Sequence, residues 1–234
     1  MAKPEVNHRK IVVFTGAGIS LAAGIPTFRF GEDALWANHK VSEVATASAL
    51  RKNPEAVISF FNDRKADILQ AEPTQAHIAI ANLEEKYEVV VITTNLDNLH
   101  EKAGSTNVIH VHGNIMNARS AVDSSLVYPM GEKPICIGDL CEHGVQLRPD
   151  VVLFDENVEL KSVAQKELKD AGKVVIIGSS LSVKPICNIF KAARGRADKY
   201  LVAPDRIKPP YGFKPIYAKA EEYIPRLCKR WMEI

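Results

Sequence analysis

Short, uninterrupted apolar runs constrain the fold of this 234-residue chain more than any other feature. Aliphatic runs without polar alternation are typical of strands that are buried on both faces of a sheet. The strongest runs are Ile11–Phe14, Val89–Thr93, Lys173–Ile177 and Tyr200–Ala203, with further candidates at Val108–Gly113 and Val151–Phe154.

Segments with helical apolar spacing separate these runs. The expected helices are Pro54–Gln70, Pro73–Lys86, a helix with Leu160, Val163, Ala164 and Leu168 inward, and Pro185–Arg196. A C-terminal helix that packs through Ile224, Leu227 and Trp231 follows. Alternation of strands and helices predicts an α/β fold, in which a mostly parallel sheet is covered by helices on both faces.

The bulk composition argues against several classes of partner. The formal charge is +2 and 46% of the residues are hydrophobic, so the chain can bury a core and gives no reason to expect nucleic acid or an anionic membrane as partner. No apolar stretch reaches the length of a membrane span, and the polar start Met1–Lys10 lacks an apolar signal region. The irregularly spaced cysteines do not suggest a disulfide framework, so we expect a reducing, cytoplasmic location.

The stretch Asn117–Asp150 has little periodicity and contains several Gly and Pro residues. We interpret it as a small module, residues 117–150, inserted into a single domain that spans residues 1–234. The large part would then comprise residues 1–116 and 151–234.

Two cysteines within this module, Cys136 and Cys141, lie close to His143 and could supply part of a zinc site. A structural zinc site normally has four ligands, and no second cysteine pair is present. Zinc is therefore doubtful, and these cysteines are only weak candidates for metal ligands.

Small and polar residues follow several of the expected strands. They are Thr15–Ser20, Thr94–Asp97, His112-Gly113 and Gly178–Ser180. Because the carboxyl ends of parallel strands meet at one edge of a sheet, these segments predict a ligand site at that edge.

The first of these turns lets the backbone approach a ligand closely, because it contains Gly16 and Gly18. Its spacing differs from the common dinucleotide fingerprint, in which a third glycine would stand at Leu21. A helix that begins near Ser20 would end almost at once, at Gly24. An ordinary strand–turn–helix connection remains an alternative for this segment alone.

The polar residues of the other turns also have two interpretations each. Asn95 and Asp97 could bind a ligand through an amide and a carboxylate, or could simply cap a turn and a helix. His110 and His112 would lie on the same face of a strand, where His112 could be a base with a pKa near neutrality or a histidine satisfied inside the sheet. No third metal ligand stands nearby in the sequence.

Taken together, the motifs resemble the signature of the sirtuin family over nearly the whole chain. The matching segments are Gly16–Ser20, Gly24–Arg29, Thr94–His100, His112-Gly113, Leu147–Pro149 before Val151, and Gly178–Pro185. The stretch Ala34–Thr46 and the helix around Phe60–Arg64 resemble the bacterial CobB-type branch, which includes lysine desuccinylases. The resemblance implies a Rossmann-like large domain with a small, usually zinc-bearing module.

The resemblance also implies an activity: NAD-dependent removal of an acyl group from a protein lysine, with transfer to ADP-ribose and release of nicotinamide. His112 matches the family's general base, which deprotonates a ribose hydroxyl, and Asn95 would act beside it. The implied cofactor-binding residues are Gly16, Ala17, Gly18, Ser20, Thr27, Phe28, Arg29, Trp36, Thr94, Asn95, Asp97, Gly178, Ser179, Ser180, Ala203, Asp205 and Ala220.

The acylated lysine peptide is expected to lie as an added strand between Val151–Glu156 and Ser182–Pro185. The residues implied in substrate binding are Phe61, Arg64, Val152, Phe154 and Val183.

The chain departs from the family pattern at several places. Thr94 stands where a Gln is usual, Asp155 replaces a Gly, and Ala203 replaces an Asn near Asp205. Arg119-Ser120 occupies the place of the first zinc cysteines, so the module is a degenerate zinc-ribbon-like region.

A further departure concerns the acyl chain. Phe61 replaces the Tyr that, with the Arg matched by Arg64, helps CobB-type enzymes hold an acidic acyl chain. We therefore predict that desuccinylation is possible but weakened, because one hydroxyl donor is lost. Competing functions are an NAD glycohydrolase or ADP-ribosyltransferase, which the shorter Thr94 could favour, and a non-catalytic NAD-binding module.

Overall fold

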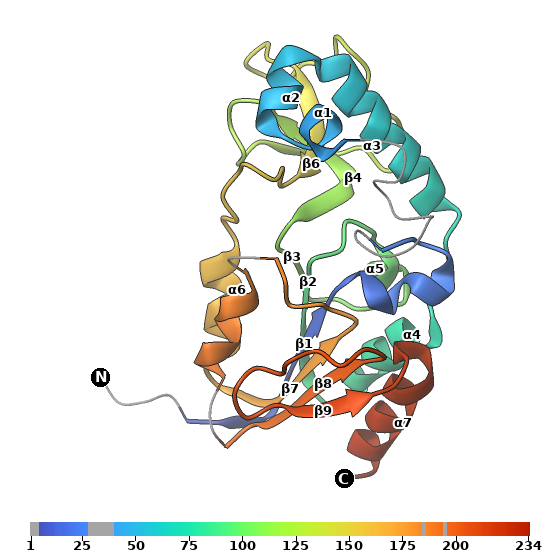
Figure 1. Cartoon of the computed structure of the whole chain (residues 1–234), viewed down its shortest axis with the longest axis vertical. Helices are drawn as coiled ribbons and strands as arrows, with labels where there is room; N and C mark the ends of the chain where they lie inside the picture. Colours follow the sequence, from blue (N-terminus) through green and yellow to red (C-terminus); the bar gives the residue numbers. More distant parts are fainter. Residues whose placement is uncertain (1–4, 28–39, 184–185, 194–195) are drawn as a thin grey trace.

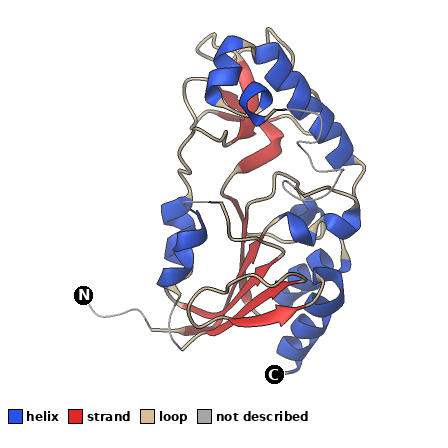
Figure 2. Cartoon of the chain, in the orientation of Figure 1, coloured by secondary structure: helices blue, strands red, loops and turns tan. Residues whose placement is uncertain are grey.

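A six-stranded, wholly parallel sheet forms the larger part of the molecule (Figures 1 and 2). The structure is a computed structural model that describes residues 5–27, 40–183, 186–193 and 196–234. The strand order is β3-β2-β1-β7-β8-β9. The strands are β1 (Asn7–Thr15), β2 (Glu88–Thr93), β3 (Val108–His110), β7 (Ala171–Ile177), β8 (Asp198–Ala203) and β9 (Lys214–Tyr217).

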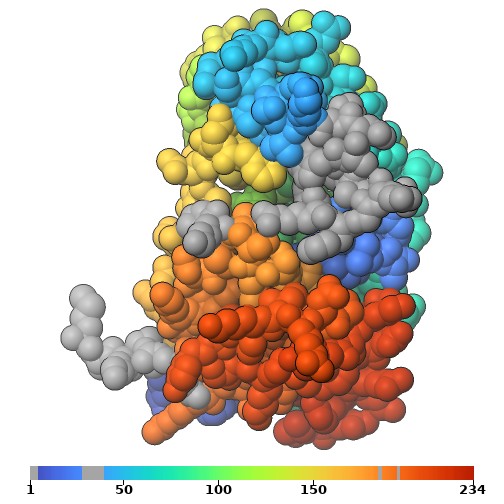
Figure 3. Space-filling model, in the orientation of Figure 1, coloured from blue at the N-terminus to red at the C-terminus, as the bar shows by residue number. Residues whose placement is uncertain are grey.

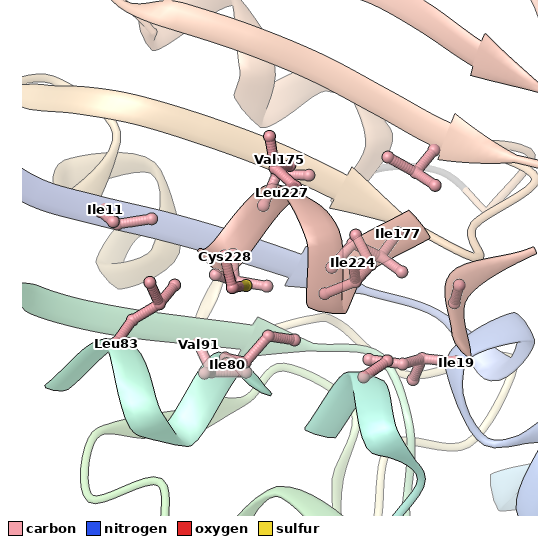
Figure 4. Close-up of a cluster of buried hydrophobic side chains, with 14 of the residues drawn as sticks. Ile11, Ile19, Ile80, Leu83, Val91, Val175, Ile177, Ile224, Leu227 and Cys228 are labelled. Carbon is pink, nitrogen blue, oxygen red and sulfur yellow. The ribbon is translucent and has the colours of Figure 1, made fainter. Parts of the chain in front are cut away.

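Alternate residues of the central strands pack into two separate hydrophobic cores, one on each face of the sheet, as expected for strands buried on both faces. On one face Ile11, Val91 and Val175 pack against helices α4 (Gln75–Asn82) and α7 (Ala220–Glu233) (Figure 4). On the other face Val12, Phe14 and neighbouring residues pack against α6 (Lys161–Glu167) and the 3-10 helix η4 (Ile186–Ala192). The predicted parallel sheet with helices on both faces is confirmed.

A second, antiparallel sheet of three strands forms the smaller part, at the top of Figure 1. Its order is β5-β4-β6, with β4 at Gly113–Ser120, β5 at Val127–Pro129 and β6 at Leu147–Val151. The expectation of a strand at Val151–Phe154 is wrong, because the strand ends at Val151 and belongs to this small sheet.

Helices from an earlier part of the chain cover this small sheet. They are α1 (Val41–Val44), α2 (Ala47–Lys52) and α3 (Pro54–Leu69). On α3, Ile58 packs against Ala118 and Leu147, and the Asn62 side chain exchanges two hydrogen bonds with the backbone of Ile135, at 2.8 and 3.0 Å. The division of the chain at residues 117–150 stays a prediction.

The helical turns that follow β1, beside the candidate site, are short. The turn after β1 continues as two 3-10 helices, η1 (Ala17–Ile19) and η2 (Leu21–Ala23), which end at Gly24 with a left-handed φ of 82°. This agrees with the predicted early end of that helix. The helix α5 (Leu99–Lys102) and the 3-10 helix η3 (Leu83–Glu85) complete the described elements. Among the described helices, none has the length and apolar character to cross a membrane.

Candidate functional site

A cavity of about 690 Å³ lies at the carboxyl edge of the parallel sheet, where the two parts of the molecule meet (Figure 3). Its walls include the ends of β1, β2, β7 and β8, together with residues of the small part. The residues expected from the sequence that line it are Gly16, Ala17, Gly18, Thr27, Thr94, His112, Gly178, Ser179, Ser180, Ala203, Asp205, Ala220, Phe61, Val152, Phe154 and Val183.

A smaller cavity of about 30 Å³ lies beside the first and shares Ala17, Phe61 and Leu96 with it. Asn95, Asp97 and Arg64 line this smaller cavity. The buried Ser20 lies behind both walls, and Phe28, Arg29 and Trp36 fall outside the described residues.

The turns after β1 and β7 touch through their backbones. The N–H of Gly18 donates to the carbonyl oxygen of Gly178 at 2.9 Å, and that of Gly16 donates to Ile177 at 3.0 Å. A Cβ at Gly16, Gly18 or Gly178 would lie within 2.9 Å of backbone atoms, so the glycines are required sterically. No acceptor among the described residues pairs with the N–H of Ala17, which leaves this donor for a ligand.

The N-terminus of α7 opens onto the same cavity through Lys219, Ala220 and Glu221. A helix N-terminus presents unpaired N–H groups and the positive end of the helix dipole, both of which favour an anion.

A buried hydrogen-bond network fixes the polar residues after β2. The Ser20 hydroxyl donates to the Asp97 carboxylate at 3.0 Å and accepts from the Asn95 side-chain amide at 3.2 Å. The Leu99 N–H also donates to Asp97, at 3.2 Å. Burial raises the pKa of Asp97, and the hydrogen bonds from Leu99 and Ser20 oppose this shift.

Asn95 is held on three sides but keeps one free acceptor. Its N–H donates to the Thr93 hydroxyl at 3.0 Å, and its carbonyl lies 3.2 Å from Nδ1 of His110. Its side-chain Oδ1 is buried and has no partner among the described residues. A buried acceptor without a partner is costly, so this atom marks a place where a ligand donor can bind.

His112 faces the large cavity from the turn after β3. Burial lowers its pKa, while a hydrogen bond to the backbone of Thr94 acts in the opposite direction. The ring is therefore neutral near pH 7 and can accept a proton. The expectation that His110 and His112 share a strand face is wrong, because β3 ends at His110 and only His112 reaches the cavity.

The loop after β6, which forms one wall of the cavity, is hydrogen-bonded to the segment around α2. The N–H of Phe154 donates to Ala45 at 3.0 Å, and the Asp155 carboxylate accepts from the N–H groups of Ala47 and Ser48, the first turn of α2. Burial acts to raise the pKa of Asp155, but hydrogen bonds from backbone N–H groups, including those of Ala47 and Ser48, and the nearby charge of Arg51 outweigh it, so the net shift is downward. These bonds of Phe154 and Asp155 join the loop to α2 and to the segment before it.

Glu156, at the end of this loop, is paired with two buried arginines. Its carboxylate lies 2.7 Å from Arg148 and 3.1 Å from Arg119, and it accepts the N–H of Leu153 at 2.9 Å. Hydrogen-bonded charge pairs of this kind fix the backbone of the loop that carries them.

Phe61 and Arg64, one turn apart on α3, occupy the end of the cavities nearest the small part. The Arg64 guanidinium lies 3.2 Å from the Asp67 carboxylate, and its Nε is buried with no partner among the described residues. Phe61 is buried edge-to-face against Phe60 and brings no polar atom.

The two cysteines that are weak candidates for metal ligands are not part of a cluster of metal-binding side chains among the described residues. Cys136 is exposed, whereas Cys141 is buried and its thiol donates to Ser120 at 3.5 Å. Within the described ranges, no three His, Cys, Asp or Glu side chains are grouped to bind a metal ion.

Several cavity residues carry no signal that sequence reasoning could have used. Leu181 lines the wall with an unusual left-handed φ of 54°, and Ile186 and Ile207 reach it from η4 and from the loop after β8. Apolar residues in a wall look like core residues in a sequence, because burial by a ligand and burial by the protein select the same side chains.

Comparison with known proteins agrees with this geometry. The model of the Sir2 family matches residues 16–185. An "NAD-dependent protein deacylase" of Helicobacter pylori is 42% identical over 196 residues, covering 84% of this chain and 85% of that protein. A protein of the same name from Aggregatibacter actinomycetemcomitans is 41% identical over 206 residues, covering 88% and 96%.

Solved structures show the same fold. A Sir2 homologue in complex with NAD superposes with a TM-score of 0.84 at 31% identity, covering 96% of this chain and 90% of the other. A Sir2 protein with a deacetylated peptide and acetyl ADP-ribose superposes with a TM-score of 0.76 at 28% identity, covering 95% and 93%. From the match of the family model to most of its length and from these relatives, the chain belongs to the Sir2 family.

Proposed function

We propose that the protein is an NAD-dependent protein-lysine deacylase, which transfers the acyl group to ADP-ribose and releases nicotinamide. The observation that carries this proposal is that His112, the glycine turns after β1 and β7, and the loop after β6 line one cavity. A nucleotide and an acylated lysine could therefore meet at a neutral imidazole. The names of the relatives support the same activity.

The residues present fit NAD. The cavity of about 690 Å³ has the size of a cofactor site. Gly16, Gly18 and Gly178 form a cradle of two turns packed so closely that a Cβ at any of them would meet the backbone of the other turn. The Ala17 N–H and the N-terminus of α7 favour phosphate oxygens. The unpaired Oδ1 of Asn95 suits an amide or hydroxyl donor, such as those of the nicotinamide end.

Bound NAD supplies an anomeric carbon that loses nicotinamide and accepts the acyl oxygen. His112 has the role of the base, because its burial-lowered pKa keeps a ring nitrogen free to take a ribose hydroxyl proton near pH 7. Its hydrogen bond to the backbone of Thr94 fixes the ring orientation. Asn95 and Asp97 orient the sugar end, held by Ser20.

The remaining cofactor contacts are proposed for Thr27, Thr94, Ser179, Ser180, Ala203, Asp205 and Ala220, all on the cavity wall. Phe28, Arg29 and Trp36 stay in this proposal on the strength of the sequence motif alone.

We propose that the acylated peptide binds as an added strand along the loop that carries Val152 and Phe154, facing Val183. Phe154 is 57% exposed, which suits an apolar contact that a peptide would cover.

The acyl end of the site favours a neutral acyl group over a succinyl group. Phe61 offers no hydrogen bond, and Arg64 already pairs with Asp67 at 3.2 Å. Asp67 neutralises part of the guanidinium charge that a succinyl carboxylate would use, so we propose deacetylation as the main reaction and weak desuccinylation.

Nicotinamide release with and without an acetyl-lysine peptide tests the function. Release that requires peptide, with formation of acetyl ADP-ribose, is expected. Peptide-independent release would instead indicate an NAD glycohydrolase, a possibility that Thr94 raises because its hydroxyl is turned to the Thr15 carbonyl at 3.1 Å. Binding of NAD without release would indicate a sensor.

The variant His112→Ala separates chemistry from binding. It should abolish peptide-dependent release while NAD affinity stays close to that of the wild type. Loss of NAD binding in this variant would assign His112 a structural role.

A further inference from the structure

His110, which has no part in the proposed chemistry, lies directly behind the candidate site. Its Nδ1 is 3.2 Å from the backbone carbonyl oxygen of Asn95, and its Nε2 is 2.7 Å from the Glu101 carboxylate. We infer that His110 is a doubly protonated positioning residue, which holds Asn95 in place through that backbone carbonyl. This inference rests on the proposed function, in which Asn95 orients the sugar end of NAD.

The two partners of His110 determine its protonation state. A carbonyl oxygen and a carboxylate are both acceptors, so each ring nitrogen must carry a proton to make its hydrogen bond. The Asn114 amide nitrogen also approaches Nε2, at 3.5 Å. The contact of Nε2 with Glu101 is shorter by 0.8 Å, and it therefore determines that Nε2 carries a proton.

The charged groups around the ring support an imidazolium. Glu101 on α5 is its ion-pair partner, and Asp97 after β2 adds a further favourable charge. The buried His100, also on α5, is held neutral and adds no repulsion, because burial lowers its pKa well below the usual value. Burial lowers the pKa of His110, but Glu101, the Asn95 carbonyl and Asp97 outweigh it, so the net shift is upward.

Loss of one proton from the His110 ring would break its hydrogen bond to the Asn95 carbonyl. A neutral imidazole keeps a single N–H, and the carboxylate of Glu101 is a stronger acceptor than a carbonyl. The remaining proton therefore stays on Nε2, and the lone pair of Nδ1 then faces the carbonyl oxygen of Asn95. The wild-type enzyme should thus lose kcat/KM for NAD at alkaline pH, in an alkaline limb that belongs to His110 rather than to His112.

Two variants separate the contacts. In His110→Asn the side-chain amide nitrogen takes the place of Nδ1, so the bond to Asn95 is kept without a titrating group. In His110→Gln the amide takes the place of Nε2, so the contact with Glu101 is kept and the bond to Asn95 is lost. We expect the Asn variant to lack the alkaline limb, and the Gln variant to lose roughly tenfold in kcat/KM for NAD at every pH.

Glu101→Gln gives a third readout. Its amide can donate to Nε2, so the single imidazole proton stays on Nδ1, toward Asn95, and the alkaline limb should disappear here too. The exposed His8, on β1, provides the matched control, because His8→Gln should keep the wild-type pH profile. Thermal unfolding of each variant checks that it folds.

The outcomes are distinct. An alkaline limb that persists unchanged in His110→Asn, or a His110→Gln variant with wild-type kcat/KM, would overturn the inference. If the wild type shows no peptide-dependent turnover, the proposed function fails, and the same variants are compared by calorimetric titration of NAD across pH. Weaker NAD binding in His110→Gln than in His110→Asn then supports the positioning role, and equal binding rejects it.

Discussion

The N–H of Gly18 donates to the carbonyl oxygen of Gly178 at 2.9 Å, and the two backbones are so close that neither residue could carry a Cβ without a shift. This contact joins the turns after two neighbouring parallel strands, β1 and β7, at the floor of the cavity. The shape of the proposed phosphate cradle therefore depends on the absence of two side chains.

Substitution of Gly18 by Ala should reduce NAD affinity by at least tenfold, because a Cβ would lie 2.7 Å from the Cα of Gly178. Calorimetric titration measures this loss. Gly172→Ala is the matched control, since its Cβ would also meet backbone, at 2.6 Å from the Asn7 carbonyl, but at the opposite end of β7. An equal loss of NAD affinity in both variants would mean that the effect is one of stability rather than of the cradle.

Phe61→Tyr should raise the ratio of desuccinylation to deacetylation by about tenfold, because the new hydroxyl can donate to an acyl carboxylate beside Arg64. The measurement is kcat/KM for matched succinyl and acetyl peptides. Phe60→Tyr, on the adjacent ring outside both described cavity walls, should leave the ratio unchanged. A wild-type preference for succinyl-lysine would contradict our account of this site.

Asp155→Ala should raise KM for the peptide several-fold and leave KM for NAD nearly unchanged. The carboxylate ties the proposed peptide loop to the first turn of α2, through Ala47 and Ser48. Asp123→Ala is the control, because Asp123 makes similar bonds, to Ser125, in an exposed turn. Equal increases in both KM values would show that Asp155 supports the whole cavity rather than the peptide loop.

The free energy of unfolding should fall as the pH is lowered below about 6.5, through the buried His77 and His100. Burial lowers the pKa of His77 from 6.5 to about 4, so the folded state favours the neutral ring and the unfolded state takes up a proton first. The stabilisation is complete above pH 6.5 and is lost as the pH falls toward about 4. His77 alone accounts for about 3 kcal/mol over this window.

Urea unfolding at neutral and mildly acidic pH measures this loss. His77→Gln should flatten the dependence, and His8→Gln should not, because His8 is exposed. If the free energy of unfolding of His77→Gln fell by the same amount at acidic pH, the pH dependence would come from other groups.

The parallel sheet could be predicted from the sequence because β1, β2, β7 and β8 are continuous apolar runs, which local pattern alone identifies. The sequence analysis does not predict β9, because Lys214 and Pro215 break such a run. The strand lies at a sheet edge, where one side has no neighbouring strand and a proline is tolerated. The strand that ends at Val151 was misassigned because its partner β4 is separated from it in the sequence by residues 121–146. Local sequence pattern does not predict pairing over such a distance.

The candidate site could be predicted only in part, for the same reason. Small and polar residues at strand ends identified the turns that meet at the cavity, such as Gly16–Ser20 and Gly178–Ser180. His110 and His112 have different surroundings because β3 ends at His110. The alternation of side chains along a strand does not predict where the strand ends. The cover of α3 over the small sheet is likewise set by long-range packing.

The order of the strands has a consequence for synthesis on the ribosome. β1 lies between β2 and β7, so a nascent chain that ends before Ala171 has an unpaired edge on its central strand. Both layers of helices are also incomplete at that stage, because η4 on one face and α7 on the other both follow Ala171. Truncations before Ala171 should consequently associate through this open edge and require chaperones to stay dispersed, whereas a chain that includes residues 171–234 closes the edge with β7.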